Sequence, residues 1–223
     1  MAHKINPYII ADFETGGLES SKAAITQVAL LCISGDTLQE VGRYDAYIKP
    51  YVADYDPKAL EYTGITFEML NAKGKELKVV KEEVAALIKK WREETGSTHT
   101  KKPILVGQNI MFDCGFFQQL AKETKQDLSQ WFDGREDSYG NYQINYIDTQ
   151  SLGKMTWGGD ETMNKFQLGV MIQKAELELA DAHSAMNDVI GTKELFIHFI
   201  NKLRSSGNGI QGEKVRVRDH WQM

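Results

Sequence analysis

The sequence predicts an α/β protein with a mixed sheet, in which an antiparallel three-strand meander is joined to parallel strands and helices cover both faces. Three runs rich in β-forming residues follow one another near the start of the chain, with only short connections between them. Shorter apolar runs then alternate with helical patterns over the rest of the chain. Consecutive strands with short connections pair antiparallel, whereas strands separated by helices commonly return parallel. We therefore expect the last two strands to run parallel to the first.

The first run, Tyr8 to Gly17, is an apolar strand that ends in two carboxylates and a pair of glycines. Side chains on a strand alternate between its faces, so Asp12 and Glu14 point to one side and Phe13 to the other. Two like charges at the end of a buried run repel each other and lose hydration. A bound cation would remove both costs, and carboxylate oxygens without Cys or His suit Mg²⁺ or Mn²⁺. Because an isolated D-x-E pattern is more often an ordinary polar strand end, other residues must decide.

The remaining elements are predicted from turn residues and periodicity. Further strands are expected over residues 24–33, 38–48, 103–108 and 142–147. Helices are expected over residues 57–63, 76–95, 109–120, 164–174 and 183–203. Asp56 and Pro57 are typical of a helix start, as the cap and the first helical residue, and Gly96 is typical of a helix end. Residues 126–143 have no period and many turn formers, which indicates a long loop.

The composition indicates one large domain, residues 1–203, followed by a short tail, residues 204–223. The formal net charge of −5 means that binding to a polyanion requires a local basic strip or metal ions. Cys32 and Cys114 have no C-x-x-C spacing, which favours a reducing compartment. The sequence has no signal peptide and no apolar run of membrane length. We expect a cytoplasmic protein without a membrane partner.

Two acidic residues further along the chain can join the first pair. Asp113 stands in the first turn of its predicted helix, where an acid commonly complements the helix dipole. Asp188 falls at the edge of an apolar stripe on the last helix, so it faces the protein. The stripe consists of Ala185, Val189, Thr192, Phe196, Phe199, Ile200 and Leu203. A carboxylate at the border of a core needs a partner, and a metal ion shared with the first strand would provide one.

A histidine and a further aspartate complete the set of candidate residues. His183 lies five residues before Asp188, nearly opposite it on an ideal helix. Both can serve one site only if His183 lies on a loop or in a frayed first turn, where its imidazole would suit a general base. Asp148 closes the last predicted strand, and we favour a cap of the following turn over a metal ligand there.

Three motifs in order resemble those of the DnaQ-like (DEDD) exonuclease superfamily. Asp12–Gly17 resembles the first motif, D-x-E-T-x-G, and Asn109–Asp113 matches the second, N-x-x-F-D. His183–Asp188 matches the third in its histidine form, H-x-x-x-x-D. The stretches Tyr62–Thr66, Glu68–Leu70 and Tyr146–Thr149 are also similar, so the resemblance covers nearly the whole chain. The sequence departs from the family pattern at Gly16, where polymerase-proofreading members often have Thr, and in the 126–143 segment.

The resemblance implies a ribonuclease H-like fold and a 3′→5′ exonuclease that releases nucleoside 5′-monophosphates. It implies two divalent cations, Mg²⁺ or Mn²⁺, bound by Asp12, Glu14, Asp113 and Asp188. It implies that His183 deprotonates the attacking water. It also assigns contacts with the terminal nucleotide to Thr15, Gly16, Asn109 and Phe112. Two such ions would bring positive charge to the phosphate, which an acidic protein otherwise lacks.

Several functions agree with these motifs. The protein could be a free DNA exonuclease, an RNA-trimming exonuclease, or a proofreading subunit whose partner is a DNA polymerase. The tail after Leu203 is short for a tether to a polymerase, which favours the free-standing enzyme. An inactive module that only binds nucleic acid or protein is a function of a different class, and the presence of every carboxylate argues against it. The expected partner is a nucleic acid with a free 3′ end, preferably single-stranded, and DNA and RNA are both open.

Overall fold

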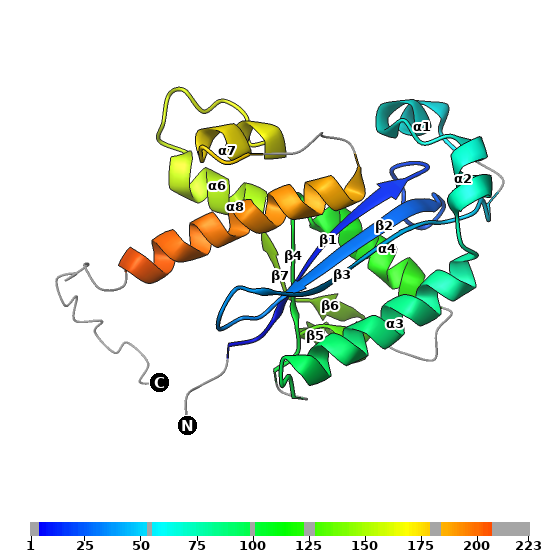
Figure 1. Ribbon diagram of the computed structural model, residues 1–223, viewed down its shortest axis with the longest axis horizontal. Helices are drawn as coiled ribbons and strands as arrows, with labels where there is room; N and C mark the ends of the chain where they lie inside the picture. The colour runs from blue at the N-terminus through cyan, green and yellow to red at the C-terminus, as the bar shows by residue number, and fades with distance from the viewer. Residues whose placement is uncertain (1–4, 53–54, 99–100, 123–127, 179–183, 207–223) are drawn as a thin grey trace.

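The fold was derived from a computed structural model that describes residues 5–52, 55–98, 101–122, 128–178 and 184–206. Its main sheet has five strands in the order β3-β2-β1-β4-β7 (Figure 1). The strands are β1 Tyr8–Thr15, β2 Ile25–Ile33, β3 Glu40–Tyr47, β4 Ile104–Gly107 and β7 Tyr146–Asp148. β1 and β3 pair antiparallel with β2, whereas β4 pairs parallel with both β1 and β7. The expected mixed sheet is therefore confirmed, with its last two strands parallel to the first.

Helices cover both faces of this sheet, as predicted (Figure 1). On one face, α8 (Ala185–Ser206) packs against Tyr8 and Ile10 of β1, and the Tyr8 and Phe196 rings lie 4.8 Å apart. On the other face, α3 (Leu77–Glu94) and α4 (Met111–Ala121) contribute to a core that includes Phe13. Because strand side chains alternate, Asp12 and Glu14 share the face of Tyr8 and Ile10 and so point toward α8.

The predicted helix starts depend on local capping. α1 (Pro57–Thr63) begins as expected, since the Asp56 side chain accepts a hydrogen bond from the Lys58 backbone N–H and Pro57 is the first helical residue. α3 lies within its predicted range, and its buried side chains lie on the sheet-facing stripe. A short helix, α2 (Phe67–Lys73), follows α1 and was not predicted. The Thr66 side chain caps it by accepting from the Met69 N–H.

The prediction of a long loop over residues 126–143 is wrong. The described part of this segment contains α5 (Leu128–Trp131) and β5 (Gly134–Glu136), which forms a two-stranded sheet with β6 (Tyr142–Ile144). The physical reason is burial, because Trp131 and Phe132 are almost completely buried in the core. Elements of three or four residues are too short to show a period in the sequence.

The single strand predicted over residues 142–147 is also wrong, because the chain changes sheets within it. β6 pairs with β5, whereas β7 pairs with β4 of the main sheet. Asn145 lies between the two strands, and its backbone and side-chain nitrogens both donate hydrogen bonds to Asp133. These bonds, rather than any turn residue recognisable in the sequence, separate the two strands.

The helices of the last third of the chain also differ from the prediction. α6 (Thr149–Trp157) follows β7 directly and was not predicted. α7 (Leu168–Lys174) begins four residues later than expected. α6 and α7 lie beside α8 (Figure 1). α8 continues to Ser206, and Leu203 is 61% exposed rather than part of the buried stripe, because the end of α8 extends beyond the sheet (Figure 1).

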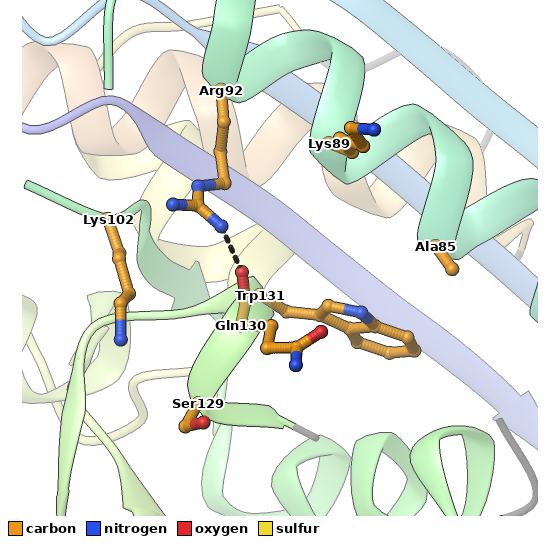
Figure 2. A pocket seen from close by; sticks show the side chains of 7 residues that line it. All are labelled: Ala85, Lys89, Arg92, Lys102, Ser129, Gln130 and Trp131. Atoms are coloured by element: carbon orange, nitrogen blue, oxygen red, sulfur yellow. Dashed lines mark hydrogen bonds between the residues drawn. The ribbon is translucent and has the colours of Figure 1, made fainter. Parts of the chain in front are cut away.

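A pocket of about 450 Å³ lies between α3 and α5 (Figure 2). Arg92 joins the two helices by donating a hydrogen bond to the Gln130 backbone carbonyl. The side chains of Lys89 and Lys102 also line the pocket but point in different directions (Figure 2). These cations therefore do not converge on one ligand position. Within the described ranges, no helix is both long and apolar enough to cross a membrane.

Candidate active site

The site forms where β1 extends beyond its neighbour β4. β4 pairs only with Tyr8, Ile9 and Ile10, so the later part of this edge of β1 has no strand beside it. Asp12 and Glu14 lie in this later part and are half-buried. Their side chains share one face of β1 because they are two residues apart.

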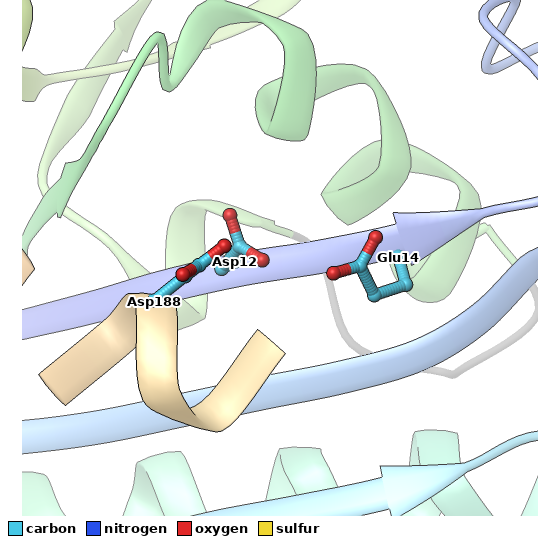
Figure 3. Close-up of side chains that lie close together, drawn as sticks. All are labelled: Asp12, Glu14 and Asp188. Carbon is cyan, nitrogen blue, oxygen red and sulfur yellow. The ribbon is translucent and has the colours of Figure 1, made fainter. Parts of the chain in front are cut away.

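α8 brings a third carboxylate to this position. Asp188 lies in the first turn of α8, and the buried residues Ala185 and Val189 on either side of it belong to the core that β1 shares. Figure 3 shows Asp188 on the helix facing Asp12 and Glu14 on the strand. Ligand oxygens of these three carboxylates all lie within 4.8 Å of one another. The structure thus brings together three of the four predicted metal ligands.

The fourth predicted ligand, Asp113, lies beside this group but is not part of it. It comes from the first turn of α4 and is only 3% exposed. Its Oδ1 accepts the backbone N–H of Phe13 at 3.0 Å. A carboxylate in this position satisfies a strand N–H on the edge of β1 that β4 leaves uncovered. Asp113 nevertheless lines the same cavity as the other three acids, whose volume is about 300 Å³.

The acids raise one another's pKa because the site holds them together away from water. Burial, followed by the charges of Asp113, Glu14 and Asp188, raises the pKa of Asp12 well above its usual range. Burial and Asp188 raise the pKa of Glu14 to about 7. Burial raises the pKa of Asp113 to about 8, although the bond from Phe13 acts in the opposite direction.

The chemistry of this donor set fits a hard divalent cation. In the described part of the chain, the residues lining the cavity include no Lys or Arg that could neutralise the acids. The ligand group contains carboxylate oxygens without sulfur or imidazole, which is the set that Mg²⁺ and Mn²⁺ prefer. Ionising clustered carboxylates is costly in the absence of a cation, so cation binding would relieve this repulsion.

Asp148 caps the segment that follows it, as predicted, and also binds a residue of the cavity wall. Its Oδ1 accepts the N–H of Gln150 at 2.8 Å, which caps α6. The same oxygen accepts the N–H of Asn109 at 3.1 Å. Asn109 has a positive φ of 57°, a conformation that Asn tolerates better than most residues. The bond from its backbone therefore holds Asn109 in place at the cavity wall.

Aromatic and amide side chains that the sequence analysis did not assign to the site also line the cavity. Tyr62 is 78% exposed at its mouth, and Gln108 lies in its wall. Gln108 is held by two bonds, to the Phe166 carbonyl and from the Thr149 hydroxyl. Tyr62 lies in a stretch that is similar to the exonuclease superfamily, and this similarity could have indicated its place in the site. No motif in the sequence includes Gln108.

Comparison with known proteins places the chain in a family. A model of the exonuclease family RNase_T matches residues 9–196. The chain belongs to this exonuclease family. Its members are DnaQ-like 3′→5′ exonucleases with a ribonuclease H-like fold, in agreement with the motifs and the sheet topology.

Solved structures of Escherichia coli exonuclease I share this exonuclease's fold. The complex with a dA16 oligonucleotide has a TM-score of 0.65 at 20% identity over 88% of this chain and 41% of that chain. The complex with dT13 has a TM-score of 0.66 at 20% identity, covering 91% and 42%. A zinc-bound form with single-stranded DNA has a TM-score of 0.67 at 19% identity, covering 91% and 42%. The exonuclease chain spans less than half of each of these proteins.

The predicted nucleotide-contacting residues of the exonuclease lie in two places. Asn109 and Phe112 line the cavity with the acids. Thr15 and Gly16 follow Glu14 and are not among the described residues that line it. The Thr15 hydroxyl donates to the Gly17 carbonyl at 2.7 Å. A Cβ on Gly16 would lie 2.4 Å from the Tyr55 ring, so this glycine permits close packing there. His183, the predicted general base, lies outside the described residues.

Proposed function

We propose that the protein is a metal-dependent 3′→5′ exonuclease that hydrolyses the terminal phosphodiester bond of nucleic acid and releases nucleoside 5′-monophosphates. The observation that carries this proposal is the meeting of Asp12, Glu14 and Asp188 within 4.8 Å, in a cavity of a chain that belongs to an exonuclease family. The four acids that line the cavity have no protein cation among the other described residues lining it. This arrangement argues against an inactive binding module, which would have no need for clustered, costly carboxylates.

Asp12, Glu14 and Asp188 would hold a divalent cation, and Asp113 beside them would help to hold a second. Mg²⁺ or Mn²⁺ would neutralise the scissile phosphate and lower the pKa of the attacking water. The cations would lie on the α8 side of β1, because Asp12 and Glu14 project from the strand on that side. Asp113 also fixes the path of β1 through its bond from Phe13.

The other residues of the cavity would orient the substrate and move the proton. Phe112 and the exposed ring of Tyr62 are placed to contact the base or sugar of the terminal nucleotide. Thr15 and the backbone of Gly16, which follow Glu14 on the chain, would contact this nucleotide, a role based on the first motif. His183 would accept the proton of the attacking water, a role based on the third motif.

The substrate class follows from the partners of similar structures. Escherichia coli exonuclease I has been solved with dA16, with dT13 and with single-stranded DNA. We propose a single-stranded nucleic acid with a free 3′ end as the substrate of this chain. Of the free-standing and polymerase-associated forms, we propose a free-standing cytoplasmic enzyme, without a DNA polymerase as a required partner.

The deciding experiment compares linear and circular substrates. A single-stranded oligonucleotide labelled at its 5′ end should shorten as a ladder in Mg²⁺, and the released product should be nucleoside 5′-monophosphate. Closed circular single-stranded DNA should survive, and Asp188→Asn should neither shorten the linear strand nor release the nucleotide.

Chelation by EDTA should abolish the ladder, and Mg²⁺ or Mn²⁺ should restore it. Rapid cutting of the circle, or full activity in EDTA, would contradict the proposal. Parallel DNA and RNA ladders decide between these substrates.

A further inference from the structure

A groove of about 740 Å³ opens directly from the cavity that holds the acids. The cavity and the groove share four lining residues, namely Tyr62, Gln108, Asn109 and Asp188. The groove continues from these residues along α6 and α7. Because Asp188 belongs to both, a strand whose phosphate lies at the acids has a direct path into the groove.

The lining of this groove is almost uncharged. Among the described residues, Asp188 is the only charged side chain that lines it, and Leu168 and Val170 contribute apolar surface. A phosphate would find no cation there to offset its charge. The lining therefore suits the uncharged parts of a nucleotide, which are the base and the sugar.

Side-chain amides recur along the lining of the groove, at Gln108, Asn109, Gln150, Gln167 and Gln173. The Gln108 amide is already engaged by Phe166 and Thr149, and Gln150 accepts a bond from Lys154. Gln167 and Gln173 are exposed, and within the described ranges no hydrogen bond engages their side-chain amides. Each of these two amides therefore presents a free donor and a free acceptor to the groove.

We propose that the groove binds the base of the nucleotide on the 5′ side of the scissile phosphate, and that Gln167 and Gln173 hydrogen-bond to its edge. A side-chain amide matches the adjacent donor and acceptor positions of a base edge. This inference rests on the proposed function, in which Phe112 and Tyr62 hold the terminal nucleotide in the cavity. The groove, on the far side of the shared residues, is then left for the retained strand.

Gly169 provides a way to fill the groove without disturbing the protein. It lies in α7 on the groove wall, and a Cβ added there would meet no atom within 4 Å. Its backbone does not have a left-handed conformation, so a side chain is tolerated. Gly159, in the turn after α6, has equally open surroundings but does not line the groove. Gly169→Phe therefore blocks the groove, and Gly159→Phe is its matched control.

The test measures how much the enzyme gains from the penultimate base. Removal of the terminal nucleotide is followed on two single strands, one intact and one with a stable abasic analogue at the penultimate position. In the wild type and in Gly159→Phe, removing this base should lower kcat/KM about tenfold or more, the usual scale of a bidentate side-chain contact with a base edge. In Gly169→Phe, the abasic and intact strands should be cleaved at rates within about twofold of each other. The Phe ring would occupy the groove, so the penultimate base could not bind there in either strand.

The double variant Gln167→Ala/Gln173→Ala keeps the test informative if Gly169→Phe does not fold. Its dependence on the penultimate base should fall well below that of the wild type. Equal dependence in the wild type and in these variants would overturn the inference, as would a wild type that cleaves both strands equally. In both cases the proposed function would stand. A wild type that releases no nucleotide from either strand would overturn the proposed function, and the inference with it.

Discussion

At the scale of the residue, three carboxylates are held together at a cost to the folded protein. Asp12, Glu14 and Asp188 come within 4.8 Å of one another, and burial with mutual repulsion raises the pKa values of Asp12 and Glu14. Structural stability alone gives no reason for such a cluster, because an isolated buried charge is destabilising. The cluster therefore supports the proposed metal site, in which its members and His183 should differ in how they act.

Asp188→Asn should lose metal affinity and turnover together, because it removes a charge where the cation binds. The metal-free variant should also unfold at a higher temperature than the metal-free wild type at pH 8, since one source of repulsion is gone. Isothermal titration with Mn²⁺ and thermal unfolding in EDTA measure the two effects. Lower stability of the metal-free variant would show that Asp188 has a structural role instead.

His183→Ala should separate proton transfer from metal binding. If the imidazole only accepts the water proton, metal affinity should stay nearly unchanged while turnover falls by roughly 10²–10⁴-fold. The remaining rate should lose the rise near pH 6.5 that an ordinary imidazole gives. Calorimetric titration and single-turnover rates across pH check both statements. Loss of the metal would make His183 a ligand, and turnover near that of the wild type would make it a bystander.

At the scale of the element, Asp148 connects β7, α6 and the start of the second motif. One oxygen caps α6 at Gln150 and also accepts the N–H of Asn109. Asn109 lies between β4 and α4, at the wall shared by the cavity and the groove. The residue that caps α6 therefore also fixes the backbone of Asn109 and, through it, the position of the Asn109 side chain.

Asp148→Ala should weaken substrate binding more than metal binding. Loss of the cap should cost about 1 kcal/mol of stability, and a protein of this size would then unfold about 2–4 °C lower. KM for single strands should rise because Asn109 loses its anchor, while Mn²⁺ affinity should stay close to that of the wild type. Asp148→Asn, which keeps an acceptor oxygen, should recover much of both losses. An unchanged KM in Asp148→Ala would exclude the positioning role.

At the scale of the whole molecule, the sheet topology converts separate motifs into one site. The antiparallel meander places β1 at the centre of the sheet, and β4 covers only its first half. α8 packs on the face of the sheet that carries Tyr8 and Ile10, and its first turn places Asp188 beside Asp12 and Glu14 (Figure 3). The site gathers four of the acids of this acidic protein in one cavity and thereby links folding to pH.

The metal-free protein should become less stable as the pH rises from about 4.5 to about 8. The folded-state pKa values of Glu14 and Asp113, about 7 and about 8, exceed their unfolded values of 4.5 and 3.8. The folded protein therefore binds more protons than the unfolded chain in this range, and its stability is lost as these protons leave. Added Mg²⁺ or Mn²⁺ should restore the unfolding temperature at pH 8 and release protons on binding.

Thermal unfolding in EDTA across this pH range measures the effect. Asp188→Asn should show a shallower decrease, because Glu14 then has one charge fewer beside it. A wild-type unfolding temperature that stays constant or rises between pH 5 and pH 8 would contradict the raised pKa values.

Features that depend on residues adjacent in the chain could be predicted from the sequence. The alternation in β1 predicted that Asp12 and Glu14 share a face, and Asp56 with Pro57 predicted the start of α1. α3 is long enough for the spacing of its apolar residues to predict a helix without knowledge of the elements that it packs against. The three motifs predicted the family, because each consists of a few consecutive residues and can be recognised without knowledge of the fold.

Features that depend on contacts between distant residues could not be predicted in this way. Burial of Trp131 and Phe132 ordered a segment without periodicity, and the bonds of Asn145 to Asp133 moved the chain between sheets. Leu203 became exposed because α8 extends beyond the sheet, which no pattern within the helix could indicate. Tyr62 of α1 and Gln108, which follows β4, both line the cavity although they are far apart in the sequence. Local propensity acts over one or two turns of chain, whereas burial and the geometry of a site are set by residues that packing brings together from far apart.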